Sequence, residues 1–371
     1  MTDRCLEHVN TKEERRKQLN EFEKHYRQSQ ICEIASEEQY GDVLQKCQKG
    51  KKNTLFYSWP MNTSNAIEII CYNFWLEQNL LTWSSEEISL TKDIETFHQT
   101  PEQLKNISAV MLGMLAIGDN IILQNLSDVS QIITNNYFLN AISRQEDVEM
   151  THSDFYSRSL DILNDKGKSV YYKSEHFINN ELYLIKKFAE KHSTDNLNKI
   201  AFFIMMCERL YFLPAFVTVA YLGITGYAKS VASGNRYVMR DENLHYSLWR
   251  NISANFEYKI NKNEALCILD EFENVLKNVV KNIFKNYTSD DAMFSIDIML
   301  DIITYAFEDF RVMNGLTKYK EIKQPNTNLL KYLSYETDFN LMESTSVNYK
   351  TELEIDASQI NTNLYDKIII E

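Results

Sequence analysis

Two parts of the chain repeat one arrangement of potential metal ligands, and this repeat restricts the fold more than any other feature. Each part begins with an acidic residue inside an apolar segment, Asp119 in the first and Glu208 in the second. A lone carboxylate in an apolar helix is costly to bury unless it is paired or bound to a metal. A Glu-x-x-His pair follows on the next segment in both cases, Glu149/His152 and Glu242/His245. The repeat predicts two units that face each other around a buried site.

Helical geometry makes such a site feasible. Residues three and four apart share one face of an α-helix, so Glu149, His152 and Tyr156 would point the same way. An offset of about 30 residues between acid and pair suits neighbouring antiparallel helices. Two units would then bring four carboxylates and two imidazoles together, the ligand set of ferritin-like di-iron and di-manganese proteins. Taken alone, the stretch from Arg144 to Tyr156 favours an ordinary solvated helix face, and only the repeat changes this interpretation.

A third Glu-x-x-His pair, Glu95/His98, shows that the motif by itself is weak. The pair precedes Thr100-Pro101, which we interpret as an N-cap followed by proline at the first helical position, and no apolar run surrounds it. We therefore interpret Glu95/His98 as unrelated to the metal site.

Turn-forming residues are scarce. The chain has 9 Gly and 4 Pro in 371 residues, against about 26 and 19 at average usage. No alternating pattern is long enough to form a sheet. We therefore predict an all-α fold, a ferritin-like helical bundle with additional helices.

Apolar periodicity and composition divide the chain into three parts. Residues 1–50 form a charged N-terminal extension, residues 51–323 a ferritin-like di-metal helical domain, and residues 324–371 a flexible C-terminal tail. Residues 82–93 have the caps of a turn entering a helix. Within the domain, helices are predicted at about 102–124, 131–163, 180–191, 198–223, 235–255, 264–287 and 291–313.

Charge, cysteine spacing and the apolar runs disfavour a nucleic-acid partner, a secreted protein and a membrane protein. The formal net charge of −13 disfavours nucleic acid. The six cysteines lie far apart, which is typical of reduced thiols in a cytoplasmic protein, and the N-terminus lacks the apolar core of a signal peptide. Ile200 to Ile224 is the one membrane-length apolar run, but it contains Glu208, Arg209 and Pro214, so we expect a buried helix and no membrane.

From about Phe56 to Tyr349 the sequence resembles a known family, the small, radical-generating subunit of class I ribonucleotide reductase. The most specific matching stretches are Glu149–Tyr156 and Arg240–His245. Trp83–Ile94 and Asp119–Leu126 support them.

The resemblance implies roles for individual residues. The metal ligands would be Asp119, Glu149 and His152 at one site and Glu208, Glu242 and His245 at the other, holding two Fe ions, with Mn or a mixed Mn/Fe pair as alternatives. Tyr156 falls on the radical tyrosine, and Phe212 and Phe216 on its apolar pocket. Trp83 and Asp241 would link His152 to the surface. Tyr349, with Tyr365 as a competitor, would pass the radical onward.

The resemblance also implies an activity and partners. The di-metal centre would activate O₂ and form a stable tyrosyl radical. The large subunit, bound through the C-terminal tail, would use that radical to reduce ribonucleotides to deoxyribonucleotides. A homodimer is implied as well. Two alternatives stay open: another ferritin-like di-metal carboxylate oxidase or oxygenase, which would need no partner protein, and an iron-storage or purely structural protein.

Overall fold

The computed structural model describes residues 65–162, 183–192, 197–256, 260–288, 291 and 293–317, with the single residues Pro325, Leu329 and Leu333. The predicted N-terminal extension and both tail tyrosines, Tyr349 and Tyr365, lie outside them. These described residues form helices and no strand. The helices are α4 (Ala66–Leu80), α5 (Thr91–His98), α6 (Glu102–Ile132), α7 (Asn136–Ile162), α9 (Tyr183–His192), α10 (Leu197–Met206), α11 (Leu213–Thr225), α12 (Lys229–Asn255), α13 (Lys262–Ile283) and α14 (Ile296–Met313). A 3-10 turn, η2 (Ser85–Glu87), and a π-helical segment, η3 (Cys207–Tyr211), complete the elements.

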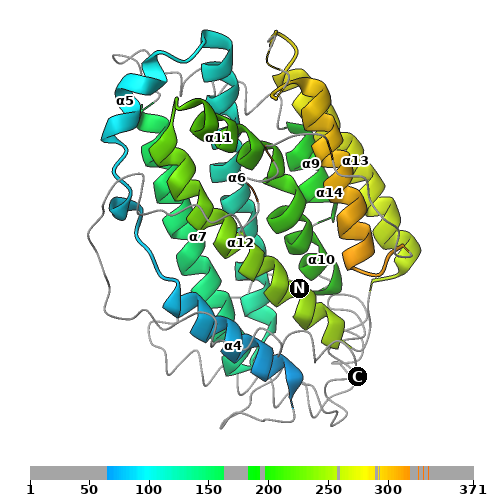
Figure 1. The fold of residues 1–371 in the computed structure, drawn as a ribbon. Coiled ribbons are helices and arrows are strands. Elements are labelled where there is room, and N and C mark those ends of the chain that lie inside the picture. The colour runs from blue at the N-terminus through cyan, green and yellow to red at the C-terminus, as the bar shows by residue number, and fades with distance from the viewer. Residues whose placement is uncertain are drawn as a thin grey trace, which may run out of the picture. The chain divides into compact units, whose positions relative to one another are not determined.

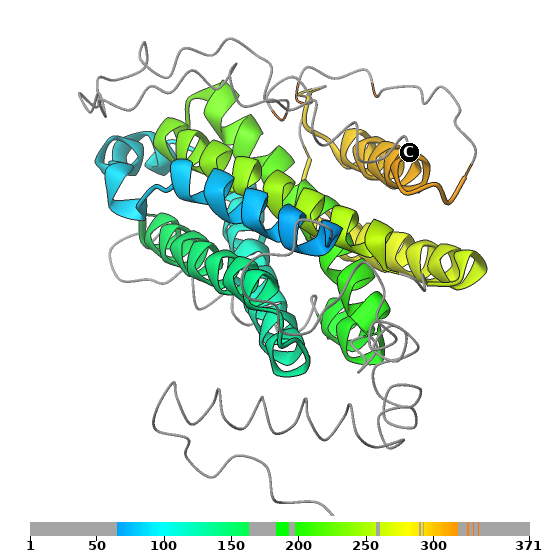
Figure 2. The same cartoon turned by 90° about the horizontal axis from the view of Figure 1, so that it is seen from below.

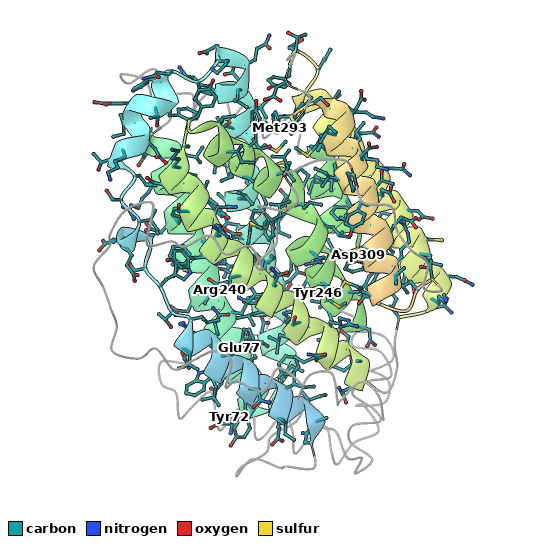
Figure 3. All side chains as sticks on the ribbon, viewed as in Figure 1. Tyr72, Glu77, Arg240, Tyr246, Met293 and Asp309 are labelled. Atoms are coloured by element: carbon teal, nitrogen blue, oxygen red, sulfur yellow. The ribbon has the colours of Figure 1, made fainter. Side chains whose placement is uncertain are left out.

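The core of the bundle consists of α6, α7, α12 and the run from α10 through α11, which lie side by side (Figures 1 and 2). Helix α6 packs on α7 and α11, and α12 packs on α10 and α11. Helix α4 lies across α7 and α12, while α13 pairs with α14. Side chains fill the spaces between these helices, and Figure 3 shows them on every element. The predicted all-α, ferritin-like bundle with additional helices is confirmed.

A glycine allows α6 and η3 to approach closely. A Cβ atom on Gly118 would lie 2.2 Å from Cε1 of Phe212 and 2.6 Å from Cε1 of Tyr211. Both distances are shorter than any van der Waals contact, so a larger residue would force the segments apart. Gly118 precedes Asp119, so α6 and η3 approach each other closely next to this acid.

Side-chain caps begin several elements. Ser84 and Glu87 form a capping box at η2, as the sequence predicts for residues 82–93. The carboxylate of Asp93 accepts hydrogen bonds from the backbone amides of Ser230 and Val231, which satisfies the first turn of α12. The predicted cap at Thr100 is wrong by one residue. Pro101 itself precedes the first helical residue, Glu102.

Four predicted helix boundaries are wrong by five residues or more. Helix α12 begins at Lys229 rather than Asn235, and α14 begins at Ile296 rather than Asp291. Helix α6 runs to Ile132 rather than Gln124, and α7 begins at Asn136 because the side chain of Asn135 accepts hydrogen bonds from the amides of Tyr137 and Phe138. The single helix predicted over 198–223 is divided by η3, and Pro214 lies in the first turn of α11. Proline fits there because the first amides of a helix need no intrahelical acceptor.

Two helical stretches are long and apolar enough to cross a membrane, Glu102–Gln131 and Leu197–Thr225. The sequence prediction named only the second. Most of the second stretch is buried among other helices, as expected of the core of a bundle.

Candidate metal centre

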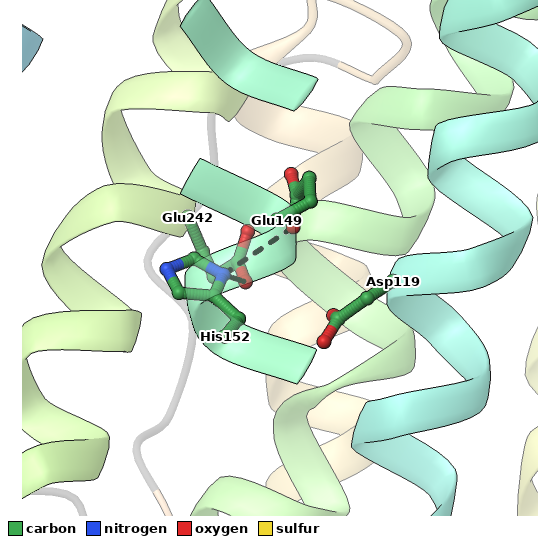
Figure 4. Close-up of side chains that lie close together, drawn as sticks. All are labelled: Asp119, Glu149, His152 and Glu242. Atoms are coloured by element: carbon green, nitrogen blue, oxygen red, sulfur yellow. Dashed lines mark hydrogen bonds and ion pairs between the residues drawn. The ribbon is translucent and has the colours of Figure 1, made fainter. Parts of the chain in front are cut away.

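The six predicted ligands converge from four helical segments. Asp119 comes from α6, Glu149 and His152 from α7, Glu208 from η3, and Glu242 and His245 from α12. All six are buried. Figure 4 shows Asp119 reaching across from its helix toward Glu149, His152 and Glu242. The doubled sequence pattern therefore folds as predicted, into one buried cluster.

The cluster divides into two groups that share two carboxylates. Asp119, Glu149, His152 and Glu242 form one group, and Glu149, Glu208, Glu242 and His245 the other. Within each group the potential ligand atoms lie within 4.8 Å of one another. Glu149 and Glu242 belong to both groups and can therefore bridge two cations. The resemblance assigns each of these two residues to a single site, so their membership of both groups is a finding of the structure.

Both histidines turn Nδ1 toward the carboxylates. Nδ1 of His152 lies 3.1 Å from Oε1 of Glu242 and 3.3 Å from Oε2 of Glu149. Nδ1 of His245 lies 3.0 Å from Oε1 of Glu149 and 3.2 Å from Oε2 of Glu242. Imidazole nitrogen beside carboxylate oxygen is a donor set that suits Fe and Mn.

Unpartnered buried atoms show that the cluster fits cations. Both carboxylate oxygens of Asp119 are buried without a hydrogen-bond donor among the described residues. Such groups are costly to bury alone. The four carboxylates carry a formal charge of −4, which two divalent cations would balance. Asp119, Glu149, Glu208, Glu242, His152 and His245 thus fit a pair of divalent metal ions.

Burial and mutual repulsion perturb the acids. Burial, with the charge of Glu149, raises the pKa of Asp119 well above its ordinary value. Burial, with the charge of Glu242, does the same for the pKa of Glu208. Burial opposes ionisation of Glu242 too, but hydrogen bonding to Glu208 and the charge of His152 hold its pKa below the ordinary value. Without cations the cluster therefore keeps protons that metal binding would displace.

Glu208 lies in a π-helical segment. The five residues Cys207–Tyr211 interrupt the run from α10 into α11. A single π turn inside an α-helix is rare and is found frequently at functional sites. The extra residue of a π turn changes the direction in which side chains point around the helix axis, here at the potential ligand Glu208. The apolar pattern of residues 198–223 contains no signal for this.

Gln145 donates hydrogen bonds to two carboxylates of the cluster, those of Glu149 and Glu208. Its Nε2 donates to Oε1 of Glu208 at 2.7 Å and to Oε1 of Glu149 at 3.2 Å, while its Oε1 accepts from Nε1 of Trp249 at 2.8 Å. Gln145 precedes Glu149 by one turn. Sequence reasoning misses it because Glu208 and Trp249 are 63 and 104 residues away along the chain.

Tyr156 is fully buried beside the cluster, as the sequence predicts. Burial raises its pKa well above the ordinary value, and the charge of Asp119 adds to the effect, so the phenol stays neutral. Its hydroxyl donates to Oδ1 of Asn235 at 3.1 Å, and its ring lies 5.5 Å from that of Phe155. Phe212 and Phe216, expected around the tyrosine, are buried and lie 5.8 Å apart, with Phe212 against Gly118.

A hydrogen-bonded link leads away from His152. Its Nε2 lies 3.3 Å from Oδ2 of Asp241, and the same oxygen accepts from Nε1 of Trp83 at 2.7 Å. The Trp83 ring also stacks on the imidazole, with centroids 6.1 Å apart, and on the half-buried ring of Tyr237 at 5.5 Å. The three residues that the resemblance joins, His152, Asp241 and Trp83, are therefore in contact.

Two further residues, Gln78 and Arg240, contact the carboxylate of Asp241. Gln78 donates to its Oδ1 at 3.0 Å, and the guanidinium of Arg240 lies 3.1 Å from the same oxygen. Burial opposes ionisation, but hydrogen bonding to His152 lowers the pKa of Asp241 below its ordinary value. The carboxylate is thus held charged and in place.

The remaining Glu-x-x-His pair does not join the cluster. Glu95 and His98 are exposed on α5, whose other face buries Phe97. Neither belongs to a group of potential ligands among the described residues. The interpretation of this pair as unrelated to the metal site agrees with its position.

Comparison with known proteins shows a family. The model of the family "Ribonucleotide reductase, small chain" matches residues 62–319. A ribonucleoside-diphosphate reductase small chain of African swine fever virus (isolate Pretoriuskop) is 22% identical over 318 residues, which cover 80% of this chain and 93% of that protein. The ribonucleoside-diphosphate reductase subunit beta of Treponema pallidum is 26% identical over 201 residues, covering 52% of this chain and 57% of that protein.

Solved structures share the fold. A putative class I ribonucleotide reductase from Bacillus halodurans superimposes with a TM-score of 0.61 at 20% identity, over 71% of this chain and 99% of that chain. The dimanganese(II)-NrdF of Streptococcus sanguinis gives a TM-score of 0.62 at 16% identity, over 75% and 100%.

Proposed function

Because the chain belongs to the family of ribonucleotide reductase small chains, we propose that its cluster forms a radical on Tyr156 and delivers the oxidising equivalent to a large subunit. The chain is a small subunit of ribonucleoside-diphosphate reductase, an oxidoreductase that works with a separate large subunit. The observation that carries the proposed radical is the burial of Tyr156 beside six converging ligands.

The residues would divide the work of holding metal as follows. Asp119, Glu149, His152 and Glu242 would hold one cation, and Glu149, Glu208, Glu242 and His245 would hold the other. When bound and exposed to O₂, a pair of iron ions, or of manganese ions, supplies the one-electron oxidant that Tyr156 requires. The donor set suits Fe, Mn and a mixed pair alike. Iron is the proposed metal, and metal analysis of the purified protein tests that choice.

Tyr156 would lose one electron and the proton on its phenol oxygen. Asp119, the acid of the cluster whose charge affects the phenol most, would accept the proton, and the electron would go to the oxidant that the six ligands hold. The Asn235 amide oxygen accepts a hydrogen bond but is too weak a base to take that proton. Full burial keeps water and reductants from the resulting radical.

The hydrogen-bonded link would carry the oxidising equivalent outward. Trp83 Nε1–H and His152 Nε2 meet at Oδ2 of Asp241, so electron and proton movements can be coupled there. Tyr349, outside the described residues, is the proposed next relay, with Tyr365 as the competing candidate. The C-terminal tail that contains both would bind the large subunit.

We also propose that the chain forms a homodimer and is located in the cytoplasm. A homodimer is supported by four partly exposed apolar side chains on α4, Tyr72, Trp75, Leu76 and Leu80. Figure 3 labels Tyr72 on that helix. A cytoplasmic location is proposed from the reduced cysteines that the sequence suggests.

A reductase assay tests the proposed function. The iron-loaded chain, mixed with its cognate large subunit, should convert a ribonucleoside diphosphate to its deoxy form, and neither subunit should do so alone. Turnover that persists without the large subunit, or a mixture without turnover, would contradict the proposal.

A further inference from the structure

Asn235 is a polar residue in the buried face of α12. That face repeats every three or four residues and consists of Val231, Asn235, Val238, Glu242, His245, Trp249 and Ile252, all of them buried. Glu242 and His245 belong to the metal centre. Asn235 belongs to neither group of potential ligands. Burying an amide is unfavourable unless it is hydrogen-bonded, so its partner decides what it does.

That partner is the phenol of Tyr156. The Tyr156 hydroxyl donates to Oδ1 of Asn235 at 3.1 Å. Tyr156 is 0% exposed and Asn235 2% exposed, so bulk water does not compete for this bond. Among the described residues, the Asn235 side chain makes no other hydrogen bond. The amide is therefore dedicated to the tyrosine.

The neighbouring residues fix this arrangement. A Cβ atom on Gly234 would lie 2.4 Å from Cζ of Phe155, so α12 and α7 approach here as closely as glycine allows. Gly234 precedes Asn235 as Phe155 precedes Tyr156. The contact between Gly234 and Phe155 therefore sets the distance between Asn235 and Tyr156.

We propose that Asn235 is a positioning residue for the Tyr156 radical, as its hydrogen-bond acceptor before oxidation and its donor afterwards. The inference rests on the proposed function. A neutral phenol donates to Oδ1, whereas a phenoxyl oxygen has no proton and can only accept. A half-turn of the Asn235 amide puts Nδ2–H where Oδ1 was and breaks no other hydrogen bond to a described residue. The radical oxygen thus keeps a partner from the protein.

Such a partner has a spectroscopic signature. A hydrogen bond to the phenoxyl oxygen withdraws unpaired spin from it, which lowers the largest g value of the radical. The donated proton also exchanges with solvent deuterium on prolonged incubation. High-field EPR and deuterium ENDOR therefore report this hydrogen bond directly, independently of turnover.

The experiment compares the iron-loaded full chain with two variants. Asn235→Leu replaces the amide with an apolar side chain of similar size, and Val231→Ile changes the same face of α12 one turn away without touching the amide. After exchange into D₂O, the wild type and Val231→Ile should show a coupled deuteron on the radical oxygen. Asn235→Leu should lose that coupling and show a higher largest g value.

The outcomes separate this inference from the proposed function. A wild-type radical without an exchangeable deuteron overturns the role of Asn235, even if Asn235→Leu does not fold. An unchanged coupling in Asn235→Leu also overturns it, since another donor then supplies the bond. A wild type that forms no tyrosyl radical overturns the proposed function, and this inference with it.

Discussion

Trp83 donates a hydrogen bond of 2.7 Å from its indole nitrogen to Asp241, and the carboxylate oxygen that accepts it also faces Nε2 of His152 at 3.3 Å. A carboxylate behind a metal-bound histidine fixes the orientation of the imidazole. Here the same oxygen is connected to an aromatic pair, because the buried Trp83 stacks on the half-buried Tyr237. The contact therefore joins the buried cluster to residues near the surface.

The first prediction concerns Trp83. In Trp83→Phe the tyrosyl radical should still form, because Trp83 belongs to neither group of metal ligands. Turnover with the large subunit should fall by about 10–100-fold, as the outward link is broken. EPR spin counting and a reductase assay on the same sample measure both effects. Normal turnover in this variant would exclude Trp83 from the transfer route.

The second prediction concerns Gln145. Gln145→Leu leaves Nε1–H of the fully buried Trp249 without its acceptor, which should lower the free energy of unfolding by about 1–3 kcal/mol. Metal affinity should also weaken by about 10–100-fold, since Glu149 and Glu208 lose a common donor. Denaturant unfolding and metal titration measure these quantities. The exposed Gln124→Leu is the matched control and should change neither. Unaltered metal affinity in Gln145→Leu would remove Gln145 from the site.

The third prediction compares a Glu-x-x-His pair of the cluster, Glu149/His152, with the exposed pair Glu95/His98. His152→Gln should lower the bound metal below two ions per chain, because His152 is buried among the ligands. His98→Gln, at the same position of the same motif on exposed α5, should keep the wild-type content. Elemental analysis after loading and desalting measures the content. A loss of metal in His98→Gln would mean that the cluster is not the binding site.

The fourth prediction concerns pH. Burial raises the pKa values of Asp119 and Glu208 above 3.8 and 4.5, and neighbouring carboxylates raise those of His152 and His245 above 6.5 despite burial. A raised pKa means that the folded state binds protons more tightly than the unfolded state. In the window above these ordinary values, the metal-free protein should therefore become more stable as the pH falls.

The metal-loaded protein should show the opposite dependence on pH, because protons compete with cations for the same side chains. The lowered pKa values of Glu242 and Asp241 act only below their ordinary range, outside this window. Thermal unfolding of both forms across a pH series should show a Tm difference that shrinks on acidification. In Asp119→Asn, the metal-free protein should depend less on pH. A Tm difference that stays constant across the series would count against a carboxylate metal site.

The sequence predicts the ligands better than their surroundings. Asp119, Glu149, Glu208 and Glu242 are predictable because an acid in an apolar helix and a Glu-x-x-His pair are local patterns. The presence of Glu149 and Glu242 in both groups of potential ligands depends instead on how α7 and α12 face each other. Gln145 and Asn235 have partners far away in the chain, so no spacing rule finds them. The resemblance, rather than any pattern, identifies Trp83 and Asp241.

Helix boundaries likewise divide into those that a local sequence pattern predicts and those that it does not. The apolar period predicts that residues 198–223 are helical, and they are, apart from the π-helical turn at Glu208. Periodicity cannot place that turn, because a π-helical segment changes the hydrogen-bond register without changing the apolar composition. The start of α7 is set by the cap at Asn135, a single polar side chain that the apolar period does not reveal.

EPR spectroscopy of the iron-loaded protein after exposure to O₂ tests the central claim most directly. The wild type should give the signal of a tyrosyl radical, and Tyr156→Phe, which keeps all six metal ligands, should bind the same amount of iron without that signal. A wild type with bound iron and no tyrosyl radical, or an unchanged signal in Tyr156→Phe, would contradict the account.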